Sequence, residues 1–406
     1  METPTPSIPV EKEFLDKLLP RLLGAQSVEV GEWEGHKLSG GLEFDSAIHR
    51  LSGTVACDGQ PRPWSLIVKT VRPGAKSADP QEFNYWKREG LAYQSGFLND
   101  LPGSLAAPRC YAVTDHPDGS LSIWIEDLKD DLIHPWSVEQ YARVARILGQ
   151  FNGAYLAGRS LPAESWVSRD WLRKYIENAA PMVAFIRQNP AHTIIQMMFP
   201  GITLPMTLAL WDNCPRLLDR LDAMPQTFCH QDAFGRNLFN CGERVVAIDW
   251  GYSGIAPLGA ELAPLVGVAA GLAKFPAGQM KELDQACFAA YLDGLRQAGW
   301  QSEPRQVRQA YTLTVSLRYV FGATVGQVLP GLLDEHTRQH WADGFEKPVE
   351  KAGETDAAIA AYYQSIFMEM IRSLGLVATT RFLLRTLGYA IRLSAKRRSR
   401  AQPAKP

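Results

Sequence analysis

The stretch FCHQDAFGRNLFNCGERVVAIDW, residues 228–250, concentrates polar side chains on a loop between two apolar runs. His230, Asp232 and Asn237 lie on this loop, and an apolar strand then leads to Asp249. Because Asp232 and Asn237 are five positions apart on one loop, they can face the same cleft, to which Asp249 returns at the strand end. A single Asp or Asn on a loop is usually a turn residue, but the joint pattern indicates a functional site.

Phosphoryl transfer from a nucleotide is the chemistry that these side chains fit. The reaction needs one carboxylate beside the attacking hydroxyl and oxygen ligands that hold Mg²⁺ against the phosphates. Its transition state is loose and spreads charge over the phosphate oxygens, so positioning and charge neutralisation do most of the work. Asp232, Asn237 and Asp249 supply a set of groups for these tasks.

The segment resembles the H-x-D-x-x-x-x-N and I-D-W motifs of the aminoglycoside phosphotransferases and their choline-kinase-like relatives, and protein kinases have a similar loop. The resemblance implies that Asp232 orients and deprotonates an acceptor hydroxyl, and that Asn237 and Asp249 bind Mg²⁺. It also implies that His230 supports the loop backbone. Gln231 departs from the glycine that is common there in this family, which argues against an aminoglycoside acceptor more than against the kinase mechanism.

The family pattern continues beyond this loop. Residues 251–263, GYSGIAPLGAELA, resemble the continuation G-P-x-G-x-D-L-A, with Gly259 retained and Glu261 in place of the usual aspartate. We expect a structural role for Glu261.

Lys69 stands within the apolar strand predicted over 64–71, where its charge needs a partner. Glu89, in the helix predicted to follow, is the first candidate, and Glu82 is the second. Alternatively, Lys69 points to solvent from an edge strand. The resemblance implies that Lys69 and Glu89 form the ion pair that positions the phosphates of ATP.

Two further segments resemble nucleotide-binding parts of the same family. Ser39, Gly40 and Gly41 form a short loop before the second strand, where glycine lets backbone amides approach phosphate closely. Glu126 and Leu128 fall in the run IWIEDL, which resembles the hinge whose backbone contacts the adenine edge. ATP is expected over GTP on the basis of the resemblance.

The secondary-structure signals change in type along the chain. A helix is predicted over 11–23, followed by strands over 27–33, 47–56 and 64–71. A helix from Asp79 to Ser95 and strands over 109–114 and 121–126 come next. Further helices are predicted over 138–156, 171–187, 208–221, 280–297, 305–322 and 357–374. This order and the resemblance imply an α+β, bilobed protein-kinase-like fold, with a small antiparallel-sheet N-lobe carrying a helix and a larger, mainly helical C-lobe.

We predict three parts along the chain. Residues 1–125 form the nucleotide-binding lobe, residues 126–375 form the hinge and the helical lobe with the catalytic loop and acceptor pocket, and residues 376–406 form a basic amphipathic tail. The tail has apolar residues near one helical face, arginines around it and the ending KRRSR before a short remainder. It is either a helix packed on the body with a solvated basic end or an interfacial helix attracted to anionic lipid.

Composition restricts the partners and the location. The chain of 406 residues is long enough for two lobes. Its 42 Lys+Arg and 43 Asp+Glu give a net charge of −1, so no nucleic-acid partner is expected. The six cysteines lack metal-finger spacing, and residues 1–13 lack the features of a secretory signal. We therefore expect reduced thiols in a cytoplasmic protein, with a membrane-peripheral alternative through the tail.

The resulting hypothesis is an ATP- and Mg²⁺-dependent phosphotransferase that moves the γ-phosphate to a hydroxyl of a small molecule. The alternative is a nucleotide-binding pseudokinase or membrane-associated scaffold. A metal-dependent hydrolase would need more histidine or carboxylate ligands than the segment 228–250 provides. For the acceptor, Arg318 in an apolar helix indicates either an anionic compound or a satisfied structural arginine.

Overall fold

A computed structural model describes residues 10–38, 46–57, 59–74, 77–132, 135–269, 275–301, 303–335, 337 and 349–401. The chain forms two compact units. Unit 1 comprises Met1–Ile133, Pro162–Ser168 and Arg236–Ser253, and unit 2 comprises His134–Leu161, Arg169–Gly235 and Gly254–Pro406. The domain boundaries predicted after residues 125 and 375 stay predictions.

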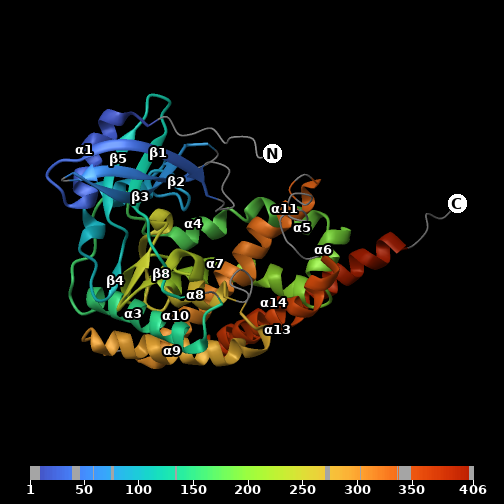
Figure 1. Ribbon diagram of the computed structural model, residues 1–406. Helices are drawn as coiled ribbons and strands as arrows, with labels where there is room; N and C mark the ends of the chain where they lie inside the picture. The colour runs from blue at the N-terminus through green and yellow to red at the C-terminus, as the bar shows by residue number, and fades with distance from the viewer. Residues whose placement is uncertain are drawn as a thin grey trace. The chain divides into compact units, whose positions relative to one another are not determined.

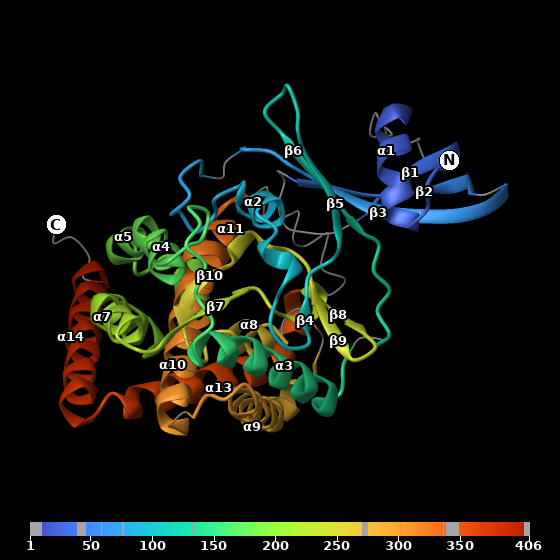
Figure 2. The ribbon, with the colours of Figure 1, turned by 90° about the vertical axis from the view of Figure 1, so that its left-hand side faces the viewer.

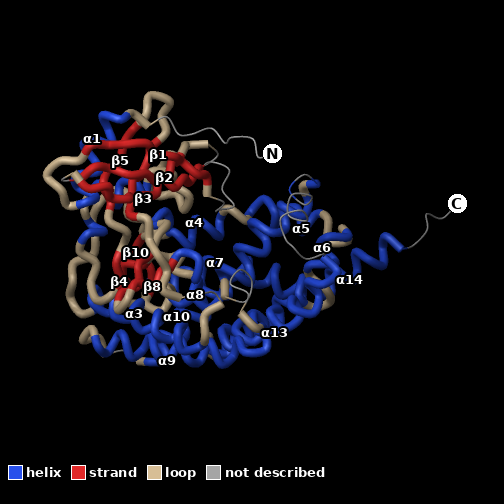
Figure 3. Tube along the Cα trace, in the orientation of Figure 1, coloured by secondary structure: helices blue, strands red, loops and turns tan. Residues whose placement is uncertain are grey.

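Unit 1 contains a five-stranded antiparallel sheet (Figures 1 and 3). In spatial order its strands are β1 (Glu29–Lys37), β2 (Ser46–Cys57), β3 (Gln60–Val71), β6 (Leu121–Glu126) and β5 (Cys110–Asp115). Side chains alternate across β3, so that Leu66 and Val68 lie in the core with Leu18 of α1 (Lys12–Leu23), and Lys69 points to the other face. Because β3 is the middle strand, the edge-strand alternative for Lys69 is wrong.

Helix α2 (Arg88–Gln94) is shorter than the helix predicted from Asp79 to Ser95. The carbonyl groups of Pro80, Glu82 and Phe83 accept hydrogen bonds from the Arg88 guanidinium at 2.9, 2.7 and 3.0 Å. In a helix, these carbonyl groups would accept hydrogen bonds from the backbone amides four residues later. Here the Arg88 side chain is the donor instead, and the helix begins only at Arg88. The 3-10 turn η1 (Phe97–Asn99) follows it.

A second sheet in unit 1 includes two strands of the stretch 236–253. Strands β8 (Leu238–Cys241) and β9 (Arg244–Ala247) form an antiparallel hairpin, and β9 also pairs in parallel with β4 (Leu105–Ala106). The short helices η2 (Gly235–Asn237) and η3 (Trp250–Tyr252) flank the hairpin. The hairpin therefore brings the residues before β8 and after β9 to the same end of the sheet.

Unit 2 is mainly helical (Figures 1 and 2). Its strands β7 (Gln226–Cys229) and β10 (Gly254–Pro257) pair antiparallel. Its helices are α3 (Val138–Leu156), α4 (Trp171–Glu177), α5 (Ala180–Gln188), α6 (Thr193–Met198), α7 (Thr203–Asp222), α8 (Leu262–Gly267), η4 (Ala277–Gln279), α9 (Met280–Gln297), α10 (Pro304–Val315), η5 (Ser316–Val328), α11 (Leu329–Leu333), α13 (Val349–Ser373) and α14 (Leu376–Ala401). The antiparallel N-terminal sheet and the helical C-terminal part confirm the predicted α+β class.

Two of the predicted helices are divided in the structure. The helix predicted over 171–187 is two helices, α4 and α5, and the helix predicted over 305–322 changes after Val315 into the π-helical segment η5. Apolar spacing does not reveal such a change, because a π-helical turn is only slightly wider than an α-helical one. In the described part of the chain, no helix is long and apolar enough to cross a bilayer.

Helices α3 and α9 approach each other closely because glycines lie at their contact. A Cβ atom at Gly294 would lie 2.0 Å from the Arg146 carbonyl oxygen, and one at Gly149 would lie 2.3 Å from the Tyr291 carbonyl oxygen. Because the helices pack closely, the Tyr291 hydroxyl of α9 donates a hydrogen bond to Asn152 Oδ1 of α3 at 2.7 Å. Helix α3 in turn contacts β7, where the Thr227 hydroxyl donates to the Asn152 carbonyl at 2.9 Å.

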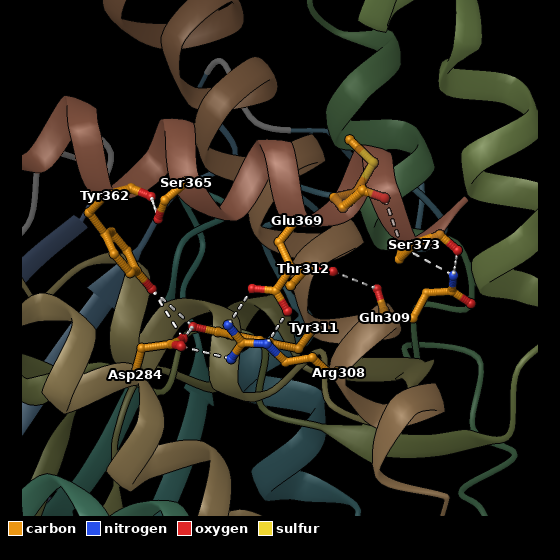
Figure 4. Close-up of polar contacts among 10 residues, drawn as sticks. Asp284, Arg308, Gln309, Tyr311, Thr312, Tyr362, Ser365, Glu369 and Ser373 are labelled. Carbon is orange, nitrogen blue, oxygen red and sulfur yellow. Dashed lines mark hydrogen bonds and ion pairs between the residues drawn. The ribbon is translucent and has the colours of Figure 1, made fainter. Parts of the chain in front are cut away.

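A largely buried polar network joins α9, α10 and α13 (Figure 4). Arg308 Nη1 lies 2.8 Å from Asp284 Oδ2, and Arg308 Nε lies 2.7 Å from Glu369 Oε1. The Tyr311 hydroxyl donates to Asp284 Oδ1 at 2.7 Å and lies 3.1 Å from the Tyr362 hydroxyl. Burial acts to lower the pKa of Arg308, but Glu369 and Asp284 raise it overall, so the network contains a permanent cation.

Replacing Arg308 by Met is expected to lower the free energy of unfolding by about 2–3 kcal/mol, because the substitution leaves the Asp284 carboxylate buried without its cation. The Asp284 side chain is only 6% exposed. Urea unfolding followed by circular dichroism measures the change. Arg296→Met is the matched control, since it removes a water-exposed pair with Asp293 on α9 and should cost less than about 1 kcal/mol. Equal losses in the two variants would contradict the prediction.

Candidate active site

Lys69 lies between two carboxylates within unit 1. Its ammonium nitrogen is 2.6 Å from Glu89 Oε2 on α2 and 2.8 Å from Asp249 Oδ1 after β9. The side chains of Lys69 and Glu89 are 12% and 5% exposed, whereas that of Asp249 is 47% exposed. The structure thus brings three predicted site residues together and selects Glu89, rather than Glu82, as the partner of Lys69.

Electrostatics keep this lysine charged. Burial acts to lower the pKa of Lys69, but the charges of Asp249 and Glu89 raise it overall above its ordinary value. For Glu89, burial acts to raise the pKa, while the Lys69 ammonium opposes that effect. A shielded ammonium beside a half-exposed carboxylate is an arrangement that can bind phosphate oxygens on its open side.

The backbone turns sharply at Asp249, whose φ of 64° lies in the left-handed region that non-glycine residues seldom adopt. Such a conformation persists only when the surrounding contacts impose it. The Trp250 indole donates to the Ala247 carbonyl at 2.7 Å, and its backbone N–H donates to the Glu89 carboxylate. These contacts hold the segment that begins with Asp249 against β9 and α2.

Arg88 provides a second support for this segment. The residue is completely buried, and its guanidinium donates to the Gly251 carbonyl at 2.8 Å and to the Trp166 carbonyl at 3.0 Å. Burial lowers the pKa of Arg88 to about 10. No sequence pattern indicated Arg88, because its partners are backbone carbonyl groups, which leave no signal in the sequence.

Asn237 and Asp249 flank the open end of the β8–β9 hairpin. The Ile248 amide donates to the Asn237 carbonyl at 2.9 Å, which closes the ladder beside both residues. Among the residues that the structure describes, no group of three or more His, Cys, Asp or Glu side chains could hold a metal. Two oxygen-bearing side chains nevertheless fit Mg²⁺, which keeps several waters and is usually bound by one or two protein groups together with phosphates. The metal role of Asn237 and Asp249 stays a prediction.

In unit 2, strand β7 leads directly into the loop that carries Asp232. His230 is completely buried, and its Nδ1 accepts a hydrogen bond from the Asp232 backbone N–H at 3.1 Å. On the other side, Asn152 Nδ2 of α3 donates to the Phe228 carbonyl at 2.9 Å. These contacts agree with a supporting role for His230, since its ring fixes the backbone of Asp232.

Glu261 holds the same loop through its carboxylate. Oε2 and Oε1 accept hydrogen bonds from the backbone amides of His230 and Gln231 at 2.6 and 3.0 Å. The side chain is completely buried, and burial raises the pKa of Glu261 to about 7 even though both amides favour its charged form. The contacts agree with the structural role expected for Glu261.

Gln231 adopts a backbone conformation that is unusual for a residue other than glycine. Its φ is 65°, in the left-handed region that glycine enters without strain. Two hydrogen bonds hold this conformation: the Gln231 backbone N–H donates to the Glu261 carboxylate, and Arg318 Nη1 donates to the Gln231 carbonyl. The Gln231 side chain lines a small pocket beside Trp171, and within the described residues its buried Nε2 has no hydrogen-bond partner.

Arg318 forms an ion pair with Asp232. Arg318 Nη2 lies 3.0 Å from Asp232 Oδ1, and their side chains are 8% and 18% exposed. The guanidinium lies over the rings of Trp171 and Tyr319, at 4.5 and 5.2 Å from the ring centroids. The sequence indicated Arg318 as a basic residue in an apolar helix, but it did not reveal that the partner would be the predicted catalytic aspartate.

The remaining predicted site residues lie at the end of β6 or outside the described residues. The Glu126 carboxylate accepts a hydrogen bond from the Arg109 amide at 3.2 Å, and the Glu126 amide donates to the Arg109 carbonyl at 2.9 Å. Leu128 follows two residues later and is partly buried. The hinge role of both residues stays a prediction. Residues 39–41, the predicted glycine loop, lie outside the described residues.

Comparison with known proteins identifies a family for this arrangement. The model of a phosphotransferase enzyme family matches residues 59–302, which is more than half of the chain. No curated protein sequence matches the chain.

Three solved structures of kinases and phosphotransferases align with this chain. An amicoumacin kinase in complex with AMP-PNP, Ca²⁺ and Ami aligns with a TM-score of 0.52 and 12% identity, over 82% of this chain and 88% of that one. A choline/ethanolamine kinase family protein from Mesorhizobium loti aligns with a TM-score of 0.42 and 17% identity, over 92% and 98% of the two chains. Spectinomycin phosphotransferase aligns with a TM-score of 0.46 and 12% identity, over 86% and 99%. At these identities the first of the three likenesses shows a shared fold, and the other two are too distant to add to it.

Proposed function

This chain belongs to the phosphotransferase enzyme family, and we propose that it transfers the γ-phosphate of ATP to a hydroxyl group of a small molecule in the cytoplasm. The observation that carries the proposal is the position of Lys69, a shielded cation between Glu89 on α2 and the half-exposed Asp249. Burying a charge on the middle strand of a sheet costs folding free energy, so its presence there indicates a role in function.

Unit 1 would bind the nucleotide. The Lys69 ammonium would contact phosphate oxygens on the side that the two carboxylates leave open, and Glu89 would hold it in place. The amides of residues 39–41 would cover the phosphates, and backbone groups of Glu126 and Leu128 would meet the adenine. The amicoumacin kinase with the same fold is solved with AMP-PNP, an ATP analogue, which supports ATP as the donor.

Asn237 and Asp249 would hold Mg²⁺ by their oxygen atoms. When bound, Mg²⁺ would neutralise charge on the β- and γ-phosphates, which a loose transition state requires. Asp249 is suited to this task, because its carboxylate is half-exposed.

Asp232 would act on the acceptor. Its carboxylate would orient the hydroxyl and accept its proton as the bond from the acceptor oxygen to the γ-phosphorus forms and the bond from that phosphorus to the bridging oxygen of ADP breaks. The ion pair with Arg318 favours the ionised carboxylate that this role needs. Because Arg318 is already paired, the structure offers no further support for an anionic acceptor.

The test is transfer of labelled γ-phosphate from ATP to a library of hydroxylated compounds, with calorimetric measurement of nucleotide binding in parallel. We expect a labelled phosphate monoester that depends on Mg²⁺ and disappears when EDTA removes the metal, because the phosphate charge is then no longer neutralised. Nucleotide binding without transfer to any compound would favour the pseudokinase alternative. Absence of both binding and transfer would overturn the proposal.

Arg318 provides a test of the state of Asp232. In Arg318→Met, the acid limb of the kcat profile should move to higher pH, because the neighbouring cation lowers the pKa of a carboxylate and its removal raises it. Arg318→Lys keeps the charge, so its acid limb should stay near that of the wild type while kcat falls. Tyr175, Tyr319 and Glu261 also face this pair and remain unchanged in both variants. Equal profiles for the two variants would show that Arg318 acts only in packing.

A further inference from the structure

Helix α14 exposes large apolar side chains on one side. At about 100° per residue, these side chains cover about a third of the helix circumference. Their exposed fractions reach 84% at Leu376 and 61% at Leu384, although a monomeric soluble protein seldom presents so continuous an apolar surface. We call this surface the apolar stripe; it consists of Leu376, Val377, Leu383, Leu384, Leu387 and Ile391.

Another face of α14 already packs within unit 2, along α7 (Figure 2). Phe382 and Thr386 are buried on that face. The Tyr389 hydroxyl donates to Asp212 Oδ2 of α7 at 2.8 Å, and Arg385 Nη1 donates to the Asp212 carbonyl at 2.9 Å. The helix is therefore held in place by contacts that do not involve the apolar stripe.

The charge of α14 has one sign. Between residues 376 and 401 the sequence contains no Asp or Glu, although the whole chain has a net charge of −1. Arg381, Arg385 and Arg392 follow one edge of the apolar stripe at helical spacing. The last turns of the helix add Lys396, Arg397, Arg398 and Arg400.

We propose that α14 docks this protein on an anionic lipid bilayer. The apolar stripe enters the boundary between headgroups and acyl chains, and Arg381 and Arg392 at its edge contact lipid phosphates. The helix lies in the plane of the interface, because apolar side chains cover only one stripe. The docking is independent of phosphoryl transfer, since no residue assigned to the reaction lies on α14.

Charge and apolar surface together favour lipid over other occupants. A second copy of the chain that packed its stripe on this one would offer the arginines no opposite charge from its own α14, which has no Asp or Glu between residues 376 and 401. A nucleic acid would neutralise the arginines but leave the leucines in water. An anionic bilayer can pair with the arginines and also bury the apolar stripe, because its negatively charged headgroups cover an apolar layer.

The test uses the full chain in flotation with phosphatidylcholine vesicles, with and without phosphatidylglycerol. We expect binding only to the anionic vesicles and weaker binding at high salt. Leu384→Gln with Leu387→Gln should weaken binding at least about tenfold, and Arg381→Gln with Arg392→Gln about fivefold per arginine. Arg216→Gln with Arg305→Gln is the matched control, because it removes the same charge from exposed positions of α7 and α10 and should bind as the wild type does.

Each alternative has a distinct outcome. A dimer in analytical ultracentrifugation that the leucine variant abolishes, together with no flotation, would assign the stripe to a second copy. Flotation that the leucine variant does not change would also overturn the proposal, since charge alone would then explain binding. Circular dichroism checks the fold of each variant, and Leu376→Gln with Val377→Gln serves as a second pair if the first is unstable. Phosphoryl transfer should be unchanged in all of these variants.

Discussion

Asp232→Asn is expected to lower kcat for phosphoryl transfer by about 10²–10⁴-fold, with little change in nucleotide affinity. The amide has the shape of the carboxylate but cannot take the proton of the acceptor hydroxyl. Asp232 belongs to unit 2, whereas the proposed ATP-binding residues Lys69 and Glu89 and the proposed Mg²⁺ ligand Asp249 belong to unit 1. The variant therefore separates the two steps, because catalysis falls while the ATP-binding residues stay intact.

Single-turnover transfer and calorimetric titration with ATP and Mg²⁺ measure the two effects of Asp232→Asn. Asp219→Asn is the control, since Asp219 pairs with Arg173 on the surface of the same unit and its side chain is 70% exposed. The control should retain full activity. If Asp232→Asn kept most of the activity, the assignment of the catalytic group would be wrong, whereas equal loss of ATP binding would indicate damage to the fold.

Lys69→Met is expected to lower kcat/KM for ATP by about 10²–10³-fold, because it removes the cation that contacts phosphate oxygens in the transition state. It also leaves the buried Glu89 carboxylate beside Asp249 with no cation between them. Part of the loss therefore appears as a lower thermal midpoint. Glu89→Gln keeps the contact of Lys69 with Asp249, so its loss of activity should be smaller than that of Lys69→Met.

Steady-state kinetics with varied ATP measure this series, and thermal unfolding with and without ATP and Mg²⁺ separates stability from binding. Lys87→Met is the matched control, because Lys87 lies just before α2 and its partly exposed side chain is 3.8 Å from Asp115. It should behave as the wild type does. Lys69→Arg keeps the charge and tests whether a failure of the Met variant reflects folding alone. Unchanged ATP kinetics in a folded Lys69→Met protein would exclude the proposed role.

The sequence predicted the elements whose signals are local. Strand β3 and helices α3 and α9 could be predicted because their apolar residues repeat with the period of a strand or of a helix. The loop before Asp249 was readable because its polar residues stand close together in the chain. Lys69 and Glu89 are 20 residues apart, yet the apolar surroundings of Lys69 indicated that it needs an acidic partner.

Contacts between distant segments were decided only by the tertiary structure. Arg318 is 86 residues from Asp232, and neither residue's neighbours in the sequence indicate the ion pair. Arg88 binds backbone carbonyl groups, which every residue has, so no choice of residue type marks its partners. The left-handed backbone at Gln231 depends on Glu261 and Arg318, from two other segments.

By itself, the sequence of residues 228–250 indicated the family, which the match over residues 59–302 confirms, and it supplied the candidate catalytic and metal-binding groups, because both depend on residue types at short spacing. The tertiary structure decided which acid holds Lys69, which cation pairs with Asp232 and which face of α14 stays exposed. The physical reason is that each of these depends on groups that only chain folding brings within a few ångströms, where hydrogen bonds and ion pairs act.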